Sequence, residues 1–169
     1  MAKYWKNLIF KEIGQLDKNI FSQIKILIAD DEPMAQIVMK HFLTELGCEV
    51  VVTNNGLEAQ SLLIEEKFDV LLTDINMPKM NGIELAICIR NSNAPCRKMP
   101  IIGITADMSE EMQQKAKIAR MNFLLEKSIS QSAIKNIIKN IAMLNCKKGT
   151  DNIKPVIFDE FEALDPAFA

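Results

Sequence analysis

Five residues with side chains suited to phosphate and metal chemistry stand at the ends of short apolar runs: Asp30, Asp31, Asp74, Thr105 and Lys127. Three carboxylates brought together at neutral pH repel one another, so such a cluster needs a cation to keep it ionised. Mg²⁺ is suited to this role, because it prefers oxygen ligands and bridges carboxylates to phosphate. Lys127 can pair with the same phosphate, and the Thr105 hydroxyl can donate a hydrogen bond to it. If the five side chains meet, they form a metal-dependent site for a phosphoryl group.

Short apolar runs alternate with longer amphipathic segments from Lys25 onward, which predicts strands alternating with helices. The runs are rich in β-branched residues, as suits buried strands. The predicted strands are 25–29, 49–53, 70–73, 101–105 and 122–125. The predicted helices are 33–46, 57–66, 82–91, 110–119 and 131–144. Helix start signals support these bounds: Pro33, Asn55 with Glu58, Ser109 and Ser130.

Strands that alternate with helices through short loops favour right-handed crossovers and a parallel sheet covered on both faces. The predicted fold class is therefore a doubly wound α/β domain. In such sheets ligands bind outside the carboxyl ends of the strands. The five residues named above all stand at those ends, so we expect them to share one crevice.

The length of 169 residues suits one well-buried domain. We divide the chain into an N-terminal flanking helix or linker at 1–23, the α/β domain at 24–144, and a linker with a short amphipathic tail at 145–169.

No apolar run reaches membrane-spanning length, so membrane insertion is not expected. The formal net charge of -2 offers no excess of cations for a phosphate backbone, so direct nucleic-acid binding is not expected either.

The four cysteines, Cys48, Cys88, Cys96 and Cys146, are widely spaced, and His41 is the one histidine. This spacing does not favour a zinc site or a disulfide framework. Free cysteines without a secretory signal are typical of a reducing compartment. We therefore expect a cytoplasmic protein.

Four motifs, in order along residues 24–144, resemble the receiver domain of two-component response regulators. They are KILIADDEP at 25–33, DVLLTDINMP at 69–78 followed by Asn81 and Gly82, ITA at 104–106, and Lys127. The resemblance implies a flavodoxin-like (βα)5 fold with five parallel strands in the order 2-1-3-4-5. Because both flanks look like connecting structure, we interpret the chain as a receiver module of a hybrid histidine kinase rather than a standalone regulator.

The resemblance also implies roles for individual residues. Asp74 matches the phosphoacceptor, which takes a phosphoryl group from a phosphohistidine on a histidine kinase or histidine phosphotransfer protein. Asp30 and Asp31 match the acidic pair that binds Mg²⁺ together with Asp74, and Asn76 matches a ligand that acts through its backbone carbonyl. Thr105 and Lys127 match the pair that senses the phosphate. Such a domain is a reversible signalling switch rather than an enzyme.

Two positions depart from the family pattern. Receiver domains usually carry an aromatic residue three positions before the lysine, where this chain has Leu124. Phe123 is adjacent, but strand side chains alternate faces, so its ring should point the other way. The family usually has proline directly after the lysine, where this chain has Ser128. Because a cis bond without proline costs about 3 to 4 kcal/mol, we expect a trans bond with an altered loop, or a strained one.

Other functions remain open at this stage. The departures allow a pseudo-receiver or protein-interaction module with a weak response to phosphorylation. A haloacid-dehalogenase-like phosphatase also uses an aspartate nucleophile, but it needs a second acid two residues later, where this chain has Asn76. A flavin- or nucleotide-binding domain needs a phosphate-binding loop rich in Gly or Ser and Thr after the first strand. The triplet there, Asp30 to Glu32, is acidic and would repel a phosphate group.

Overall fold

Five short strands pair side by side in a parallel sheet. The computed structural model describes residues 19–146, and the strands lie in the order β2-β1-β3-β4-β5. Their bounds are β1 Lys25–Ala29, β2 Glu49–Thr53, β3 Val70–Asp74, β4 Ile101–Thr105 and β5 Phe123–Glu126. Every neighbouring pair is parallel. Both the predicted α/β class and the strand order 2-1-3-4-5 are confirmed.

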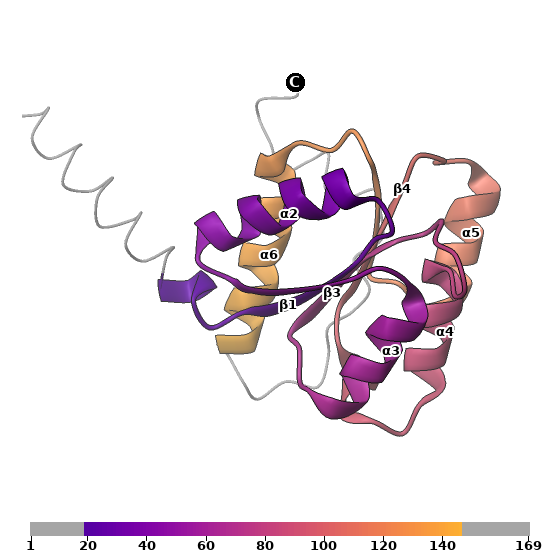
Figure 1. Ribbon diagram of the computed structural model, residues 1–169, viewed down its shortest axis with the longest axis horizontal. Helices are drawn as coiled ribbons and strands as arrows, with labels where there is room; N and C mark the ends of the chain where they lie inside the picture. Colours follow the sequence, from indigo (N-terminus) through magenta and orange to yellow (C-terminus); the bar gives the residue numbers. More distant parts are fainter. Residues whose placement is uncertain (1–18, 147–169) are drawn as a thin grey trace, which may run out of the picture.

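Helices cover both faces of the sheet (Figure 1). One layer contains α2 (Pro33–Leu46) and α6 (Gln131–Cys146), and the other contains α3 (Gly56–Glu65), α4 (Gly82–Asn91) and α5 (Glu110–Ile118). Buried side chains form two clusters, one between the sheet and each helical layer. This arrangement leaves the ends of the strands uncovered by either layer, so the loops there can carry a site.

Most element bounds match the sequence prediction to within two residues. Helix α3 begins at Gly56, one residue earlier than predicted, because Asn55 caps it and its Oδ1 accepts a hydrogen bond from the Glu58 N–H at 3.1 Å. A short 3-10 helix, η1 (Pro95–Lys98), was not predicted. Its four residues are too few to produce a periodic apolar pattern.

Strand β5 carries the two residues at which the sequence departs from the family pattern. Leu124 is 2% exposed and packs in the cluster beneath α3, α4 and α5. Phe123 packs against the opposite cluster, beneath α2 and α6. The expected alternation is therefore confirmed, and no ring occupies the Leu124 position. The described residues contain no cis peptide bond, so the bond between Lys127 and Ser128 is trans.

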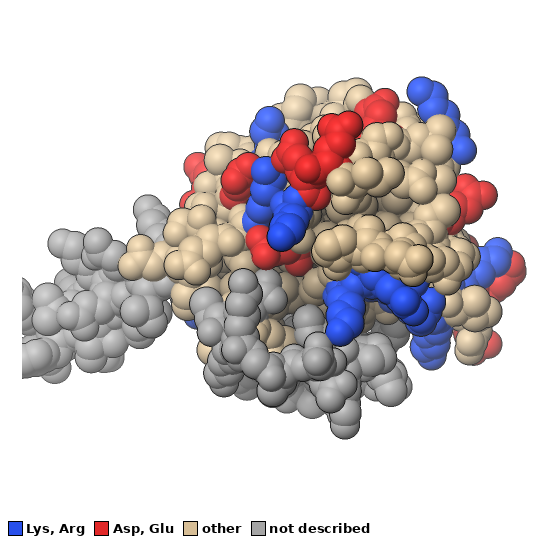
Figure 2. Space-filling view, turned by 90° about the horizontal axis from the view of Figure 1, so that it is seen from below, with Lys and Arg blue, Asp and Glu red and all other residues tan. Residues whose placement is uncertain are grey.

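The predicted flanking segments fall largely outside the described residues, which exclude 1–18 and 147–169. Within 19–146, Phe21 is buried against the α2 and α6 cluster. No helix in that range combines the length and the apolar character that a membrane crossing requires. On the face seen in Figure 2, Lys and Arg side chains stand beside Asp and Glu side chains, so neither sign of charge covers it.

Candidate functional site

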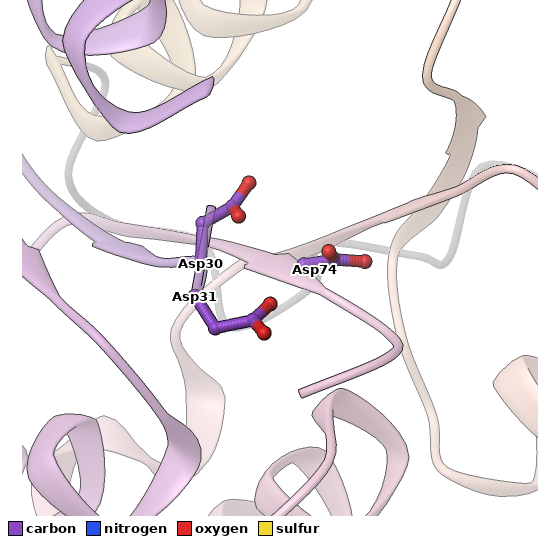
Figure 3. Close-up of side chains that lie close together, drawn as sticks. All are labelled: Asp30, Asp31 and Asp74. Carbon is purple, nitrogen blue, oxygen red and sulfur yellow. The ribbon is translucent and has the colours of Figure 1, made fainter. Parts of the chain in front are cut away.

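Three aspartates meet where β1 and β3 end (Figure 3). Asp30 and Asp31 follow β1, and Asp74 is the last residue of β3. Because β1 and β3 are neighbours in the sheet, their carboxyl ends lie side by side. One carboxylate oxygen from each aspartate lies within 4.8 Å of the other two. Asp30 and Asp74 are buried and Asp31 is exposed, so the cluster opens to solvent on one side.

Local hydrogen bonds hold Asp30 in place. Its N–H donates to the Thr53 carbonyl at 3.1 Å, which continues the pairing of β1 with β2 beyond the strand end. Its Oδ1 accepts from the Glu32 N–H at 2.9 Å, at the start of α2. The aspartate thus links the end of the strand to the beginning of the helix, as Asp side chains commonly do at helix starts.

A close backbone approach fixes Asp74. Its Oδ1 accepts from the Asn76 N–H at 3.1 Å. Gly82, the first residue of α4, donates its N–H to the Ile75 carbonyl at 2.9 Å. A Cβ at Gly82 would lie 2.3 Å from the Asp74 carbonyl oxygen, so only glycine allows the helix to begin this close to the site.

Lys127 directly follows β5, the strand at the edge of the sheet, and its side chain reaches across to the cluster. Its Nζ donates to Asp74 Oδ2 at 2.8 Å and lies 3.9 Å from a carboxylate oxygen of Glu32. Its backbone N–H donates to the carbonyl of Thr105 at 2.8 Å. The buried Thr105 hydroxyl accepts from the Asp107 N–H at 3.0 Å, so its own proton can be donated elsewhere.

The electrostatics of the cluster follow from burial and charge pairing. Burial raises the pKa of Asp30 above its ordinary value, and the neighbouring Asp74 adds to that rise. The hydrogen bond from the Glu32 N–H and the charge of Lys127 act in the opposite direction. The hydrogen bond to Asp74 raises the pKa of Lys127. A cation among the three carboxylates would therefore relieve a repulsion that is already present.

The structure brings together the side chains of Asp30, Asp31, Asp74 and Lys127 that the sequence singled out, and it ties Thr105 to Lys127 through the backbone. The side chain of Asn76 is exposed, and its contact with Asp74 runs through the main chain. Sequence reasoning did not place Glu32 or Gln36 in the site. Glu32 directly follows the aspartate pair, whereas Gln36 carried no signal, since a polar residue in a helix is ordinarily a surface residue.

A family model described as a response regulator receiver domain matches residues 26–139. The chain belongs to that family. Receiver domains are components of two-component phosphorelay signalling, so this part of the sequence-based interpretation is confirmed. The two alternatives, a pseudo-receiver or protein-interaction module and a haloacid-dehalogenase-like phosphatase, are not favoured.

Curated relatives of this receiver domain include larger sensor proteins. The chain is 32% identical over 119 residues to the sensor protein EvgS of Escherichia coli (strain K12), a match that covers 70% of this chain and 10% of EvgS. It is 31% identical over 113 residues to the sensor histidine kinase RcsC of the same strain, covering 67% of this chain and 12% of RcsC. The matches thus span about a tenth of the length of these relatives.

Solved structures agree with the fold. The receiver domain of the sensor histidine kinase PA1611 from Pseudomonas aeruginosa PAO1 superposes with a TM-score of 0.66 at 26% identity, covering 71% of this chain and 98% of that one. That structure has a magnesium ion coordinated in its active site cleft. Chemotaxis protein CheY4 of Vibrio cholerae gives a TM-score of 0.66 at 27% identity, covering 70% of this chain and 98% of that one.

Proposed function

We propose that Asp74 is the phosphoacceptor of this receiver domain and takes a phosphoryl group from a phosphohistidine on a partner kinase or phosphotransfer protein, in a reaction that requires Mg²⁺. The observation that carries this proposal is the geometry at the end of β3. The Asp74 carboxylate lies among two further carboxylates and, at 2.8 Å, the Lys127 ammonium. A buried carboxylate flanked by metal ligands and a cation is suited to accept an anionic group.

The donor set fits magnesium. Carboxylates of Asp30, Asp31 and Asp74 supply hard oxygen ligands, and we assign the Asn76 carbonyl as a further ligand. The magnesium-bearing cleft of the PA1611 receiver domain supports this assignment. When bound there, Mg²⁺ supplies positive charge to the oxygens of the transferring group. Because Asp31 is exposed, the cluster has an open side through which a hydrated ion and a phosphodonor can enter.

The proposed chemistry is a single in-line displacement. A carboxylate oxygen of Asp74 attacks the phosphorus, the phosphorus–nitrogen bond to the donor imidazole breaks, and its electron pair stays on nitrogen. An acyl phosphate on Asp74 results. Lys127 already touches the Asp74 carboxylate, so its ammonium can pair with a phosphoryl oxygen after transfer. The Thr105 hydroxyl can donate its proton to another phosphoryl oxygen.

The switch then depends on the movement of Thr105. This residue ends β4, which is paired with β5, and its carbonyl holds the Lys127 N–H. A shift of the hydroxyl toward a phosphoryl group therefore biases the packing of β5 and α5. Leu124 takes the place of the usual aromatic residue on β5, so the proposed movement does not run through a ring at that position.

The phosphodonor needs a surface beside the pocket on which to dock. Helix α2 begins directly after Glu32, and three apolar side chains near its start are exposed: Met34 by 65%, Ile37 by 60% and Val38 by 53%. Exposed apolar residues grouped on one helix are typical of a protein interaction surface. We assign this part of α2 to contact with the phosphodonor protein.

The test is incubation of the chain with Mg²⁺ and phosphoramidate, followed by intact-mass measurement. The wild type is expected to gain one phosphoryl group, whereas Asp74→Asn gains none. Asp69→Asn is the matched control, because Asp69 precedes the same strand at its opposite end. It should be modified like the wild type. An unmodified wild type, or an Asp74→Asn variant modified to the same extent, contradicts the proposal.

A further inference from the structure

A polar bridge joins two loops beside the acidic pocket. The side-chain nitrogen of Gln36 donates to the main-chain carbonyl of Asp30 at 2.5 Å and to Oδ1 of Asn54 at 3.0 Å. Gln36 is on α2, six residues after Asp30, whereas Asn54 follows β2. One amide group therefore fastens the loop between β1 and α2 to the loop between β2 and α3.

The far end of this bridge is itself fixed. Both nitrogens of Asn54, in the backbone and in the side chain, donate to one carboxylate oxygen of Glu58 at 3.0 Å. The other oxygen of Glu58 accepts from the Asn55 side chain at 2.8 Å. These hydrogen bonds lower the pKa of Glu58, so its carboxylate is charged at neutral pH. With its nitrogen held by Glu58, the Asn54 amide presents its oxygen to Gln36.

At the other end of the bridge, Gln36 contacts Asp30, a buried acidic residue. Asp30 is 8% exposed, and one of its carboxylate oxygens lies within 4.8 Å of carboxylate oxygens of Asp31 and Asp74. Without a bound metal ion, repulsion between these carboxylates acts to separate the loop that carries Asp30 and Asp31 from Asp74, and the Lys127 ammonium acts against it. The Gln36 amide opposes this separation through its hydrogen bond to the Asp30 carbonyl. The Thr53 carbonyl accepts from the N–H of Asp30, and the Glu32 N–H donates to its Oδ1.

We propose that Gln36 is a positioning residue for the cation pocket, which acts by holding the Asp30–Asp31 main chain in the geometry that binds Mg²⁺. The inference rests on the proposed function, since it assigns a further residue to the same site. Partners that orient metal ligands typically change metal affinity by about 10- to 100-fold when they are removed. Gln36 touches the main chain of one ligand and no reacting atom, so it should affect metal affinity rather than the chemical step.

The experiment is calorimetric titration of the full chain with Mg²⁺ alone, without any phosphodonor. Gln36→Met keeps the length of the side chain and removes its donors, and we expect the Kd for Mg²⁺ to rise about tenfold. Gln60→Met makes the same substitution on α3 and should leave the Kd unchanged. In metal-free protein, the Asp30 and Glu32 amide protons should exchange faster with solvent in Gln36→Met than in either the wild type or Gln60→Met.

A second variant keeps the inference testable if Gln36→Met folds poorly. Asn54→Ala removes the exposed partner of Gln36 and should weaken Mg²⁺ binding in the same direction by a smaller factor. In the double variant the two effects should be less than additive, because both break one bridge. Phosphorylation by phosphoramidate should slow at low Mg²⁺ in Gln36→Met and recover at saturating Mg²⁺.

An unchanged Mg²⁺ Kd in a folded Gln36→Met variant overturns the inference. So does a rate that stays low at saturating Mg²⁺ while the Kd is normal, because that result assigns Gln36 to the chemistry. These outcomes are separate from failure of the proposed function, which appears as a wild type that takes no phosphoryl group. The calorimetric comparison decides the role of Gln36 in either case.

Discussion

Lys127 and Asp74 are separated by 53 residues in the sequence, and a 2.8 Å hydrogen bond joins the ammonium nitrogen of one to Oδ2 of the other. The contact exists because β3, β4 and β5 are consecutive in the sheet, so their carboxyl ends are neighbours. It places a cation beside the buried carboxylate before any phosphate or metal arrives. Lys127 therefore competes with Mg²⁺ for the charge of Asp74, although it assists a bound phosphoryl group.

Replacing this lysine should separate metal binding from the response to phosphorylation. In Lys127→Ala the competing charge is gone, so the affinity for Mg²⁺ should stay the same or rise by up to about threefold. Phosphorylation-dependent changes in the amide NMR spectrum of β5 and α5 should shrink, because no ammonium pairs with the phosphoryl oxygens. Calorimetry with Mg²⁺ checks the first expectation. Asp31→Ala is the contrasting variant, and a Lys127→Ala loss of affinity as large as that of Asp31→Ala contradicts the separate roles.

The ionised side chain of Asp30 should lower the free energy of unfolding of the metal-free protein. Its pKa is raised above 3.8 by burial and by Asp74, so the folded state binds its proton more tightly than the unfolded chain does. As the pH rises above about 4, the carboxyl group ionises first in the unfolded chain, and the stability of the protonated form is lost until the pH passes the raised pKa of the folded state. Asp30→Asn removes this charge and should be about 1 kcal/mol more stable at pH 7 in a metal chelator.

Urea unfolding with and without Mg²⁺ measures this effect. Mg²⁺ should stabilise the wild type and leave Asp30→Asn nearly unchanged, because the variant lacks one ligand. Glu65→Gln, on the exposed surface of α3, serves as a charge-matched control and should show neither effect. If Asp30→Asn is less stable than the wild type in the chelator, the carboxylate is not a source of repulsion in the pocket.

Much of the site was predictable because two simple rules converge at the strand ends. The apolar period identifies the strands, and parallel pairing brings their carboxyl ends together, which is enough to gather Asp30, Asp74 and Lys127. The bridge between Gln36 and Asn54 was beyond such reasoning. Polar residues in a helix and a loop carry no periodic signal, and their pairing depends on the rotation of α2 relative to the β2–α3 loop. Side-chain orientation of this kind appears only with the fold.

Glu58 should give the fold a pH dependence at the acidic end. Hydrogen bonds from Asn54 and Asn55 lower its pKa below 4.5 in the folded state. A lowered acid pKa contributes stability that is present above the unfolded value and is lost as the pH falls through the folded value. Between about pH 5 and pH 3 the wild type should therefore lose more unfolding free energy than Glu58→Gln. Urea titrations at stepped pH compare the two slopes, and equal slopes would assign the acid sensitivity to other carboxylates.

The exposed start of α2 should matter only for a protein phosphodonor. In Ile37→Glu a charge replaces an apolar contact, so phosphotransfer from a phosphorylated partner should slow by about tenfold or more. The rate with phosphoramidate should stay at the wild-type value, because a small donor does not touch α2. Ile64→Glu is the matched control, since Ile64 is 77% exposed on α3 in the opposite layer. Equal slowing by both substitutions, or slowing with both donors, argues against a docking role.

Arg90 carries a buried guanidinium in the last turn of α4. It is 8% exposed and donates to three main-chain carbonyls, those of Arg97, Met99 and Arg120, and to the side-chain oxygen of Asn122. Burial lowers its pKa to about 10, so it stays charged at neutral pH. It thereby joins the end of α4 to η1, to the end of α5 and to the approach to β5.

Removing this guanidinium should be among the more destabilising single changes. Arg90→Met leaves carbonyl groups without their donor, and unsatisfied polar groups cost about 1 to 3 kcal/mol each when they stay buried. We expect a total loss of about 3 kcal/mol, because water can reach some of them. Arg90→Lys should recover little of the lost stability, since an ammonium group cannot reproduce the planar set of N–H donors of a guanidinium. Arg97→Met, on the exposed surface of η1, should change the unfolding free energy by less than about 0.5 kcal/mol. A wild-type unfolding midpoint in Arg90→Met would mean that the four hydrogen bonds are replaced by solvent at no cost.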